Sequence, residues 1–358
     1  MRAQEPASRR LHQRRHIVWT LKHTRILLSL TFCSTTSTFL LNEMSTQNIN
    51  LRGMCLTHPY VPPAEIADGA GAAVLANSAK LWENGQEITY AFMPPFSGAP
   101  KEQAKVHKII KEWTLFANLT FTHVPKPEDA MIRIAFNHSQ KVGSWSYVAR
   151  DCLDEKQVPK EKPTMNLGWL EDTKEPTEND KGLVLHEFGH AIGLLHEHQS
   201  PARDEVLTLK VEATITAYTS GAGPNKWTRD DVIAQIIKPV NAGEYTNYTD
   251  LDTTSVMMYF MPAEMNDQGL EITPNNALSD YDRAFVLIHY PVFDFSDRTD
   301  GWDFEKALTV MGIEGEGRDS VLEKYNAGDV PGVREEFAKA YESVRKERNA
   351  LRAAEVRG

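Results

Sequence analysis

The sequence predicts an α+β fold. Residues 87–93 and 131–136 alternate apolar and polar side chains, which is the pattern of strands. Residues 101–116 between them space their apolar side chains as one face of a helix. Three consecutive apolar residues, 183–185, lie just before His186 and suit a helix buried under a sheet. The chain thus combines predicted strands with predicted helices, which we interpret as an α+β fold.

The composition indicates a soluble globular protein. The chain has 358 residues, which is enough for one large domain with appended segments or for two domains. Hydrophobic residues make up 41% and charged residues 25%. The formal net charge of −10 argues against nucleic acid as a partner. No apolar run is long enough for a transmembrane segment, and nothing indicates the oligomeric state.

Residues 1–44 form a basic leader in which Glu5 is the only acid before Glu43. This composition fits a mitochondrial transit peptide better than a signal peptide, because the apolar stretch 26–32 is short and follows a long basic segment. An alternative is that translation begins at Met44 and the leader is misassigned. Secreted and intracellular locations therefore both stay open.

Residues 45–80 show little periodicity and include the proline-rich patch 58–63, so we expect a linker or a pro-segment. The segment contains Asp68 and also Cys55, for which an ordinary buried or free cysteine is the favoured interpretation. The cysteines of the chain are too few for a disulfide framework: Cys33, Cys55 and Cys152.

The globular part begins near Leu81 and includes a further predicted strand at 119–124. Alternation in the strand 131–136 places Arg133 on the face opposite its apolar neighbours. The charged segment 154–163 predicts a solvated loop. Asn179–Asp180 can cap the helix that leads to His186.

Residues 186–198 read HEFGHAIGLLHEH, with the spacing H-E-x-x-H-x-x-G-x-x-H. His186 and His190 are four residues apart, so they lie on one face of a helix and can bind one metal ion. On a continuous helix His196 would point away. Gly193 can adopt a positive φ, end the helix and turn the chain back. Three nitrogen ligands leave the fourth position of a tetrahedral zinc ion open, as in catalytic zinc sites.

Glu187 follows the first of these histidines directly. A carboxylate there can take a proton from water and later pass it to a leaving amine. Zinc lowers the pKa of a coordinated water toward about 7, which makes this proton transfer feasible near neutral pH. The motif therefore predicts one catalytic zinc ion with Glu187 as its acid–base partner.

The same stretch resembles the zinc motif of the metzincin metallopeptidases. Their second mark is a methionine-bearing turn, and Ser255–Tyr259, which reads SVMMY, is similar to it. Glu197 and the segments 143–147 and 198–204 most resemble the astacin branch. The resemblance covers residues 82–290. It implies a two-lobed zincin fold with a mixed twisted sheet, an active-site helix along the cleft floor and a Met-turn beneath the metal.

The resemblance also implies roles for single residues. The implied zinc ligands are His186, His190 and His196. Glu187 is the implied general base and acid, and Tyr259 is the implied phenol that stabilises the oxyanion. Whether Tyr259 also ligates zinc at rest stays open. Some metzincin pro-segments block zinc with a thiolate, and by this resemblance Cys55 is a candidate for that role and Asp68 a weaker one.

Other positions either extend the resemblance or depart from it. Met257 would form the hydrophobic floor, and Glu197 would receive a new N-terminal ammonium, with an ordinary ion pair as an equal alternative. Met258 and Ser144 stand where astacins commonly have histidine and cysteine. Cys152 is the only cysteine in the similar region, so neither intradomain disulfide of astacins can form.

The activity implied by the resemblance is a zinc-dependent metalloendopeptidase with a protein or peptide substrate. One alternative is a catalytically silent zinc-containing module that binds protein, although such a module has no need of Glu187. Another is an aminopeptidase-type metzincin, although the cysteines of the archaemetzincin type do not follow His196. Nothing in the sequence indicates the natural substrate or the residue preferred at the cleaved bond.

Downstream, helical periodicity predicts helices at 206–218 and 228–237. The loop 239–254 is expected to wall the cleft. Ser279 and Asp282 form a capping box for a further helix. The predicted domains are a catalytic domain at 81–293 and a helical C-terminal extension at 294–358, with helices at 302–311, 320–326 and 331–354.

Overall fold

The computed structural model describes residues 56–58, 80–139, 142–219, 227–239 and 251–355. The basic leader, Cys55 and Asp68 lie outside the described residues, as does most of the loop 239–254. No described helix is long and apolar enough to cross a membrane.

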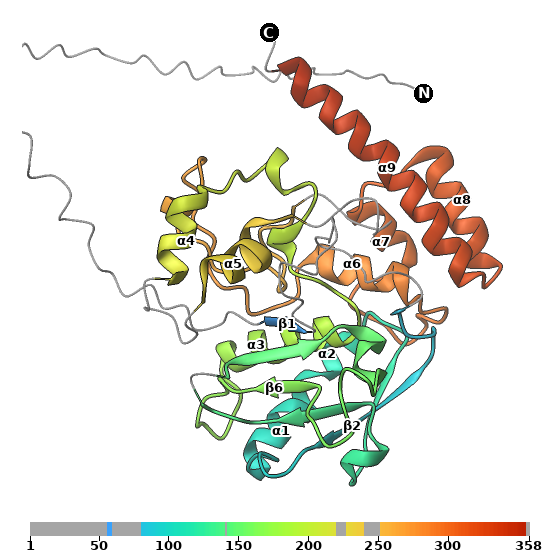
Figure 1. Ribbon diagram of the computed structural model, residues 1–358. Coiled ribbons are helices and arrows are strands. Elements are labelled where there is room, and N and C mark those ends of the chain that lie inside the picture. Colours follow the sequence, from blue (N-terminus) through green and yellow to red (C-terminus); the bar gives the residue numbers. More distant parts are fainter. Residues whose placement is uncertain (1–55, 59–79, 140–141, 220–226, 240–250, 356–358) are drawn as a thin grey trace, which may run out of the picture. The chain divides into compact units, whose positions relative to one another are not determined.

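The first lobe contains a mixed six-stranded sheet in the order β1-β5-β6-β4-β2-β3 (Figure 1). Its strands are β1 (Leu56–His58), β2 (Glu87–Phe92), β3 (Thr120–His123), β4 (Ile132–Ala135), β5 (Ser144–Tyr147) and β6 (Met165–Leu167). Only β5 and β6 pair antiparallel; every other neighbouring pair is parallel. The mixed sheet and the α+β class are therefore confirmed.

The strand β1 lies in the segment for which the sequence predicts only a linker or pro-segment. It pairs parallel with β5, with Leu56 opposite Trp145 and His58 opposite Tyr147. Three residues are too few to show an alternating pattern, so this strand could not be found from periodicity.

Strand β4 is buried on both of its faces, although its sequence alternates apolar and polar residues. Arg133 is 4% exposed, because the loop 154–163 folds over that face of the sheet. The Arg133 Nε donates a hydrogen bond to the Lys162 carbonyl at 2.8 Å, and an Nη contacts the Val158 carbonyl at 3.5 Å. Arg133, on the face opposite its apolar neighbours, thus anchors a loop that the sequence predicts to be solvated.

Three helices accompany the sheet, and the last of them carries the first two histidines of the motif. They are α1 (Pro100–Ile109), α2 (Lys111–Thr114) and α3 (Glu178–Ala191), and α3 contacts α1, α2, β5 and β6. One helix was predicted where α1 and α2 stand. The Trp113 indole on α2 donates to the Leu185 carbonyl at 2.9 Å, which ties α2 to α3.

Of the two predicted cap residues of α3, Asn179 and Asp180, only Asp180 takes part in the capping box. Thr177 is the N-cap: its hydroxyl accepts the backbone N–H of Asp180, and the Asp180 carboxylate accepts the N–H of Thr177. The capping box therefore begins at Thr177 and not at Asn179.

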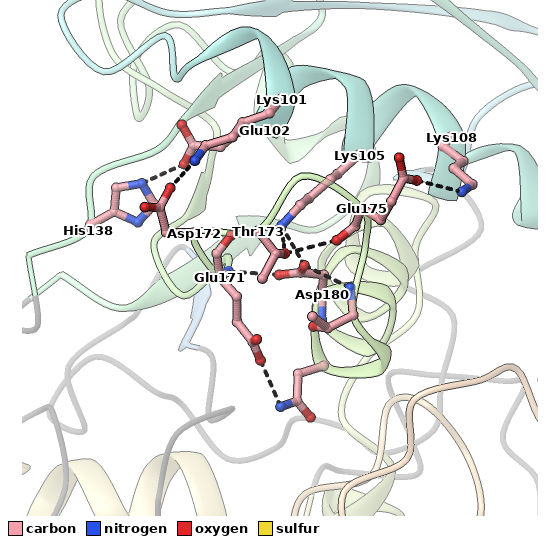
Figure 2. A network of polar contacts seen from close by, with 12 residues as sticks. Lys101, Glu102, Lys105, Lys108, His138, Glu171, Asp172, Thr173, Glu175 and Asp180 are labelled. Atoms are coloured by element: carbon pink, nitrogen blue, oxygen red, sulfur yellow. Dashed lines mark hydrogen bonds and ion pairs between the residues drawn. The ribbon is translucent and has the colours of Figure 1, made fainter.

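Asp180 also belongs to a buried polar network (Figure 2). The Lys105 ammonium on α1 donates to the Asp180 carboxylate at 2.6 Å, to the Glu171 carbonyl at 2.7 Å and to the Thr173 hydroxyl at 2.8 Å. The Lys105 and Asp180 side chains are only 1% and 0% exposed. This network joins α1, the loop before α3 and the first turn of α3.

We expect Lys105→Met to lower the free energy of unfolding by about 3–5 kcal/mol, because it leaves the Asp180 carboxylate buried without its counter-ion. The neighbouring pair Lys108–Glu175 offers a control, since its side chains are 67% and 75% exposed. Lys108→Met should change stability by less than about 0.5 kcal/mol. Urea unfolding measures both. Equal, small effects would show that the Lys105 pair does not stabilise the fold.

The second lobe has a separate hydrophobic core. It holds α4 (Val211–Thr219), α5 (Arg229–Val232) and the π-helix η6 (Ile233–Ile237), and its core includes Met258 and Tyr259. The predicted helix at 206–218 thus begins later, and the one at 228–237 changes from α to π after one turn. A capping box of Thr228 with Asp231 begins α5.

The helices after the Met-turn rejoin the first core. They are α6 (Asp280–His289), α7 (Phe304–Val310), α8 (Gly315–Asn326) and α9 (Val330–Glu355), and α8 and α9 lie side by side (Figure 1). Phe337 of α9 belongs to the same core as Phe285 of α6, and the Arg334 guanidinium donates to the His289 carbonyl at 2.6 Å. The domain boundary at 293/294 stays a prediction.

The remaining short elements are 3-10 turns in loops: η2 (Pro127–Asp129), η3 (Ala149–Leu153), η4 (Glu197–Gln199), η5 (Arg203–Glu205) and η7 (Ala263–Met265).

Candidate active site

Two histidines face the same way from α3. His186 and His190 are buried, with ring centroids 4.9 Å apart. The Nδ1 of His186 lies 2.7 Å from the Val256 carbonyl, and the Nδ1 of His190 lies 2.8 Å from the Leu194 carbonyl. A carbonyl can only accept, so each Nδ1 carries the hydrogen. Each Nε2 then carries a lone pair and could bind a metal ion, as in metal-binding histidines whose other ring nitrogen donates to a carbonyl.

The third histidine returns to this pair through the predicted glycine turn. Gly193 has a φ of 112°, in the left-handed region, and follows the end of α3 at Ala191. The Leu194 N–H donates to the Gly189 carbonyl at 2.9 Å and closes the turn. His196, which is 0% exposed, then places its Nε2 3.1 Å from the Nε2 of His190.

The three imidazoles fit a zinc ion. Their ligand atoms all lie within 4.8 Å of one another. Two nitrogens bound to one tetrahedral zinc ion are about 3.3 Å apart, close to the separation between His190 and His196. Burial lowers the pKa of His186 to about 4 and the pKa values of His190 and His196 well below 6.5. Neutral imidazole, the form that binds metal, therefore predominates at neutral pH.

The Met-turn is held by an aspartate from α6. The Ser255 hydroxyl donates to Asp282 at 2.7 Å, and the Val256 N–H donates to its other carboxylate oxygen at 2.9 Å. Burial raises the pKa of Asp282 to about 6. Since the Val256 carbonyl orients His186, Asp282 supports a metal-site histidine through the turn. The sequence predicts Asp282 only as a helix cap, and the capping-box pattern holds no signal for this second role.

Met257 packs directly against α3. A Cβ built at Gly189, between the two helical histidines, would overlap the Met257 sulfur. Met257 belongs to the first core, while Met258 and Tyr259 belong to the second. The turn thus joins the two lobes at the histidine cluster.

Gly189→Ala is expected to lower the free energy of unfolding by about 1–3 kcal/mol, because the added methyl group overpacks the contact with Met257. Helix propensity alone predicts the opposite sign, since alanine favours a helix over glycine by about 1 kcal/mol. Thermal unfolding of the chelator-treated protein gives the sign directly. A stabilised variant would show that Met257 moves away at little cost.

The two predicted catalytic residues lie in different lobes. Glu187 is fully buried on α3, next to His186. Tyr259 is 1% exposed, and its ring centroid lies 4.3 Å from that of His196 and 6.1 Å from that of His186. The fold therefore brings the phenol beside the histidine cluster from a position 63 residues after His196 in the sequence.

Glu197 lies behind the cluster and not in it. Its carboxylate accepts the Asp252 N–H at 2.7 Å, and burial raises its pKa well above 4.5. Glu197, Asp252, Ser255 and Asp282 help to line a cavity of about 20 Å³, which has room for about one water molecule. No ion pair to Glu197 occurs within the described part of the chain, so its ordinary ion-pair interpretation gains no support there.

The departures from the astacin pattern are accommodated by packing. Met258 is 4% exposed in the second core, and Ser144 lies at the start of β5. Cys152 is a free thiol, and burial raises its pKa to about 12.

A buried three-histidine site between a mixed sheet and a Met-turn defines a metzincin-type metallopeptidase fold. The chain matches the Astacin peptidase family over residues 74–276, which is more than half of its length. It therefore belongs to the Astacin family of zinc-dependent metallopeptidases.

Two relatives illustrate this membership. The structure of myroilysin has 31% sequence identity and a TM-score of 0.53, covering 60% of this chain and 97% of that chain. Astacin-like metalloprotease toxin 4 of Loxosceles laeta is 44% identical over 39 residues, or 11% of this chain. In that match the chain spans 34% of the toxin's length.

Proposed function

We propose that this protein is a zinc-dependent metalloendopeptidase that hydrolyses internal bonds of a protein or peptide substrate. The observation that carries the proposal is the convergence of His186, His190 and His196, with Glu187 beside the first of them and Tyr259 beside the last. The three imidazoles would hold one zinc ion. When bound, zinc supplies Lewis acidity, which polarises a carbonyl and makes water more acidic.

Glu187 is the proposed general base and acid. It follows a metal-site histidine on a rigid helix, so its carboxylate has a fixed position relative to the attacking water. The carboxylate takes the proton of that water as its oxygen attacks the scissile carbonyl carbon. It then gives the proton to the leaving amine nitrogen.

Tyr259 is the proposed oxyanion donor. A phenol hydroxyl remains protonated at neutral pH and can donate a hydrogen bond to the negative charge that develops on the carbonyl oxygen. The position of its ring against His196 supports this role.

We further propose that residues 81–293 form the catalytic domain and that residues 45–80 act as a pro-segment. Strand β5 lies next to α3, and β1 occupies its outer edge. An extended substrate can pair with a free sheet edge as a further strand. Because removal of residues 1–80 would free the edge of β5, a chain that begins at Leu81 should cleave peptides faster than the full chain. Equal rates would contradict the pro-segment role only.

Cleavage of an internally quenched peptide with a blocked N-terminus tests the endopeptidase proposal. We expect zinc-dependent cleavage at an internal bond, located by mass spectrometry of the products. An aminopeptidase would cut only the unblocked version of the same peptide. A silent binding module would cut neither, whether in the full chain or in the form that begins at Leu81.

A further inference from the structure

His198 stacks on the proposed oxyanion tyrosine. It follows His196 by two residues and is 0% exposed. Its ring centroid lies 4.3 Å from that of Tyr259, with 29° between the planes, which is a stacked arrangement. His198 does not belong to the group of three metal-binding histidines.

The His198 ring is itself held by the π-helix η6. Its Nε2 donates to the Gln235 carbonyl at 2.9 Å, which fixes both the tautomer and the plane of the ring. The Arg203 guanidinium, also buried, donates to the His198 carbonyl at 3.1 Å and to the Ile236 carbonyl at 3.2 Å. Gln199 adds a bond to the Ala234 carbonyl at 3.2 Å.

These contacts use the carbonyls in the last turn of η6. The last four carbonyls of a helix have no N–H partner within it, so they can accept hydrogen bonds from another segment. Here three successive carbonyls, at residues 234–236, accept bonds from the segment that directly follows His196. The second lobe therefore sets the position of the His198 ring.

We propose that His198 is a positioning residue for Tyr259: its imidazole, fixed by η6, holds the phenol ring in the orientation that the reaction needs. The inference rests on the proposed function, because it assumes that the Tyr259 hydroxyl donates to the oxyanion. A donor misplaced by a small distance or angle loses much of its effect on the transition state. A stacked neighbour restricts the rotation of the phenol about both of its side-chain torsions.

The orientation can be tested without zinc or activity. The full chain is labelled with ¹³C-tyrosine and treated with a chelator. The NMR signal of Tyr259 is assigned by comparison with the Tyr259→Phe variant, in which this signal is absent. We expect His198→Gln, which keeps a donor but loses the ring, to shift this signal. His198→Phe keeps a ring and should leave the signal closer to that of the wild type. An unchanged signal in His198→Gln would overturn the proposal.

A double-mutant cycle of His198 and Tyr259 tests whether the positioning of the phenol affects the reaction. The rates are measured in the full chain or in the form that begins at Leu81, depending on which of them cleaves the quenched peptide. His198→Gln should lower kcat about 2- to 10-fold with little change in KM, since aromatic pairs contribute in that range. In the Tyr259→Phe background it should cause no further loss. The same loss in both backgrounds would mean a general structural role and would overturn the proposal.

The cycle also separates this inference from the proposed function. If Tyr259→Phe leaves kcat unchanged, the oxyanion assignment fails, and the positioning role in catalysis fails with it, whatever the NMR signal shows. His289→Gln is the matched control. His289 is also buried, and its Nδ1 forms a hydrogen bond with the Phe285 carbonyl at 2.8 Å, but its ring packs against Phe337 of α9 and not against Tyr259. It should leave both the Tyr259 signal and kcat as in the wild type.

Discussion

Glu187→Gln is expected to lower kcat for the blocked peptide by about 10²- to 10⁴-fold, the contribution typical of general acid–base catalysis. Glutamine has nearly the same shape as glutamate but cannot accept the proton of the attacking water. Zinc content should stay at about one ion per chain, because Glu187 is not one of the converging ligands. Metal analysis and steady-state kinetics on the same preparations measure both quantities.

Glu178→Gln is the control on the same helix, since Glu178 is exposed in the first turn of α3. It should keep both activity and zinc. If Glu187→Gln retained activity within a few-fold of the wild type, another group would have to move the proton. If it lost its zinc, the lost activity would say nothing about acid–base chemistry.

His190→Ala is expected to abolish both zinc binding and cleavage. It removes one of three ligands and also the Nδ1–H bond to the Leu194 carbonyl that supports the returning turn. A ligand present at about 1,000 times its Kd stabilises a fold by about 4 kcal/mol. A chelator should therefore lower the stability of the wild type by an amount of that order and leave the variant unchanged.

His138→Ala provides the comparison for that experiment, because the His138 side chain is 48% exposed and bonds to Glu102, away from the three histidines. It should still lose stability when the chelator is added. A His190→Ala protein that bound zinc as tightly as the wild type would exclude His190 from the metal site.

Features coded by neighbouring residues could be predicted from the sequence. The helical spacing of His186 and His190 and the positive φ of Gly193 depend on a few consecutive positions, and the structure has both. Strands β2 and β4 follow from alternation for the same reason.

Features that depend on distant partners could not be predicted from local patterns, and only the family resemblance placed the Met-turn beneath the metal. Arg133 is buried because a loop about 25 residues later in the sequence supplies its hydrogen-bond acceptors. Val256, which orients His186, and Asp282, which holds the Met-turn, both lie 70 or more residues after His186. The His198–Tyr259 stack likewise joins two segments 61 residues apart. Periodicity describes one element at a time and holds no signal for such pairs.

The central claim is that one zinc ion in the three-histidine site enables the cleavage of internal peptide bonds. Its most direct test is to return zinc in steps to chelator-stripped protein while following cleavage of the blocked, quenched peptide, in the full chain and in the form that begins at Leu81. We predict no cleavage in the stripped protein and a rate that rises with zinc and levels off at about one ion per chain. Cleavage by the stripped protein, or zinc binding without cleavage in both forms, would contradict the account.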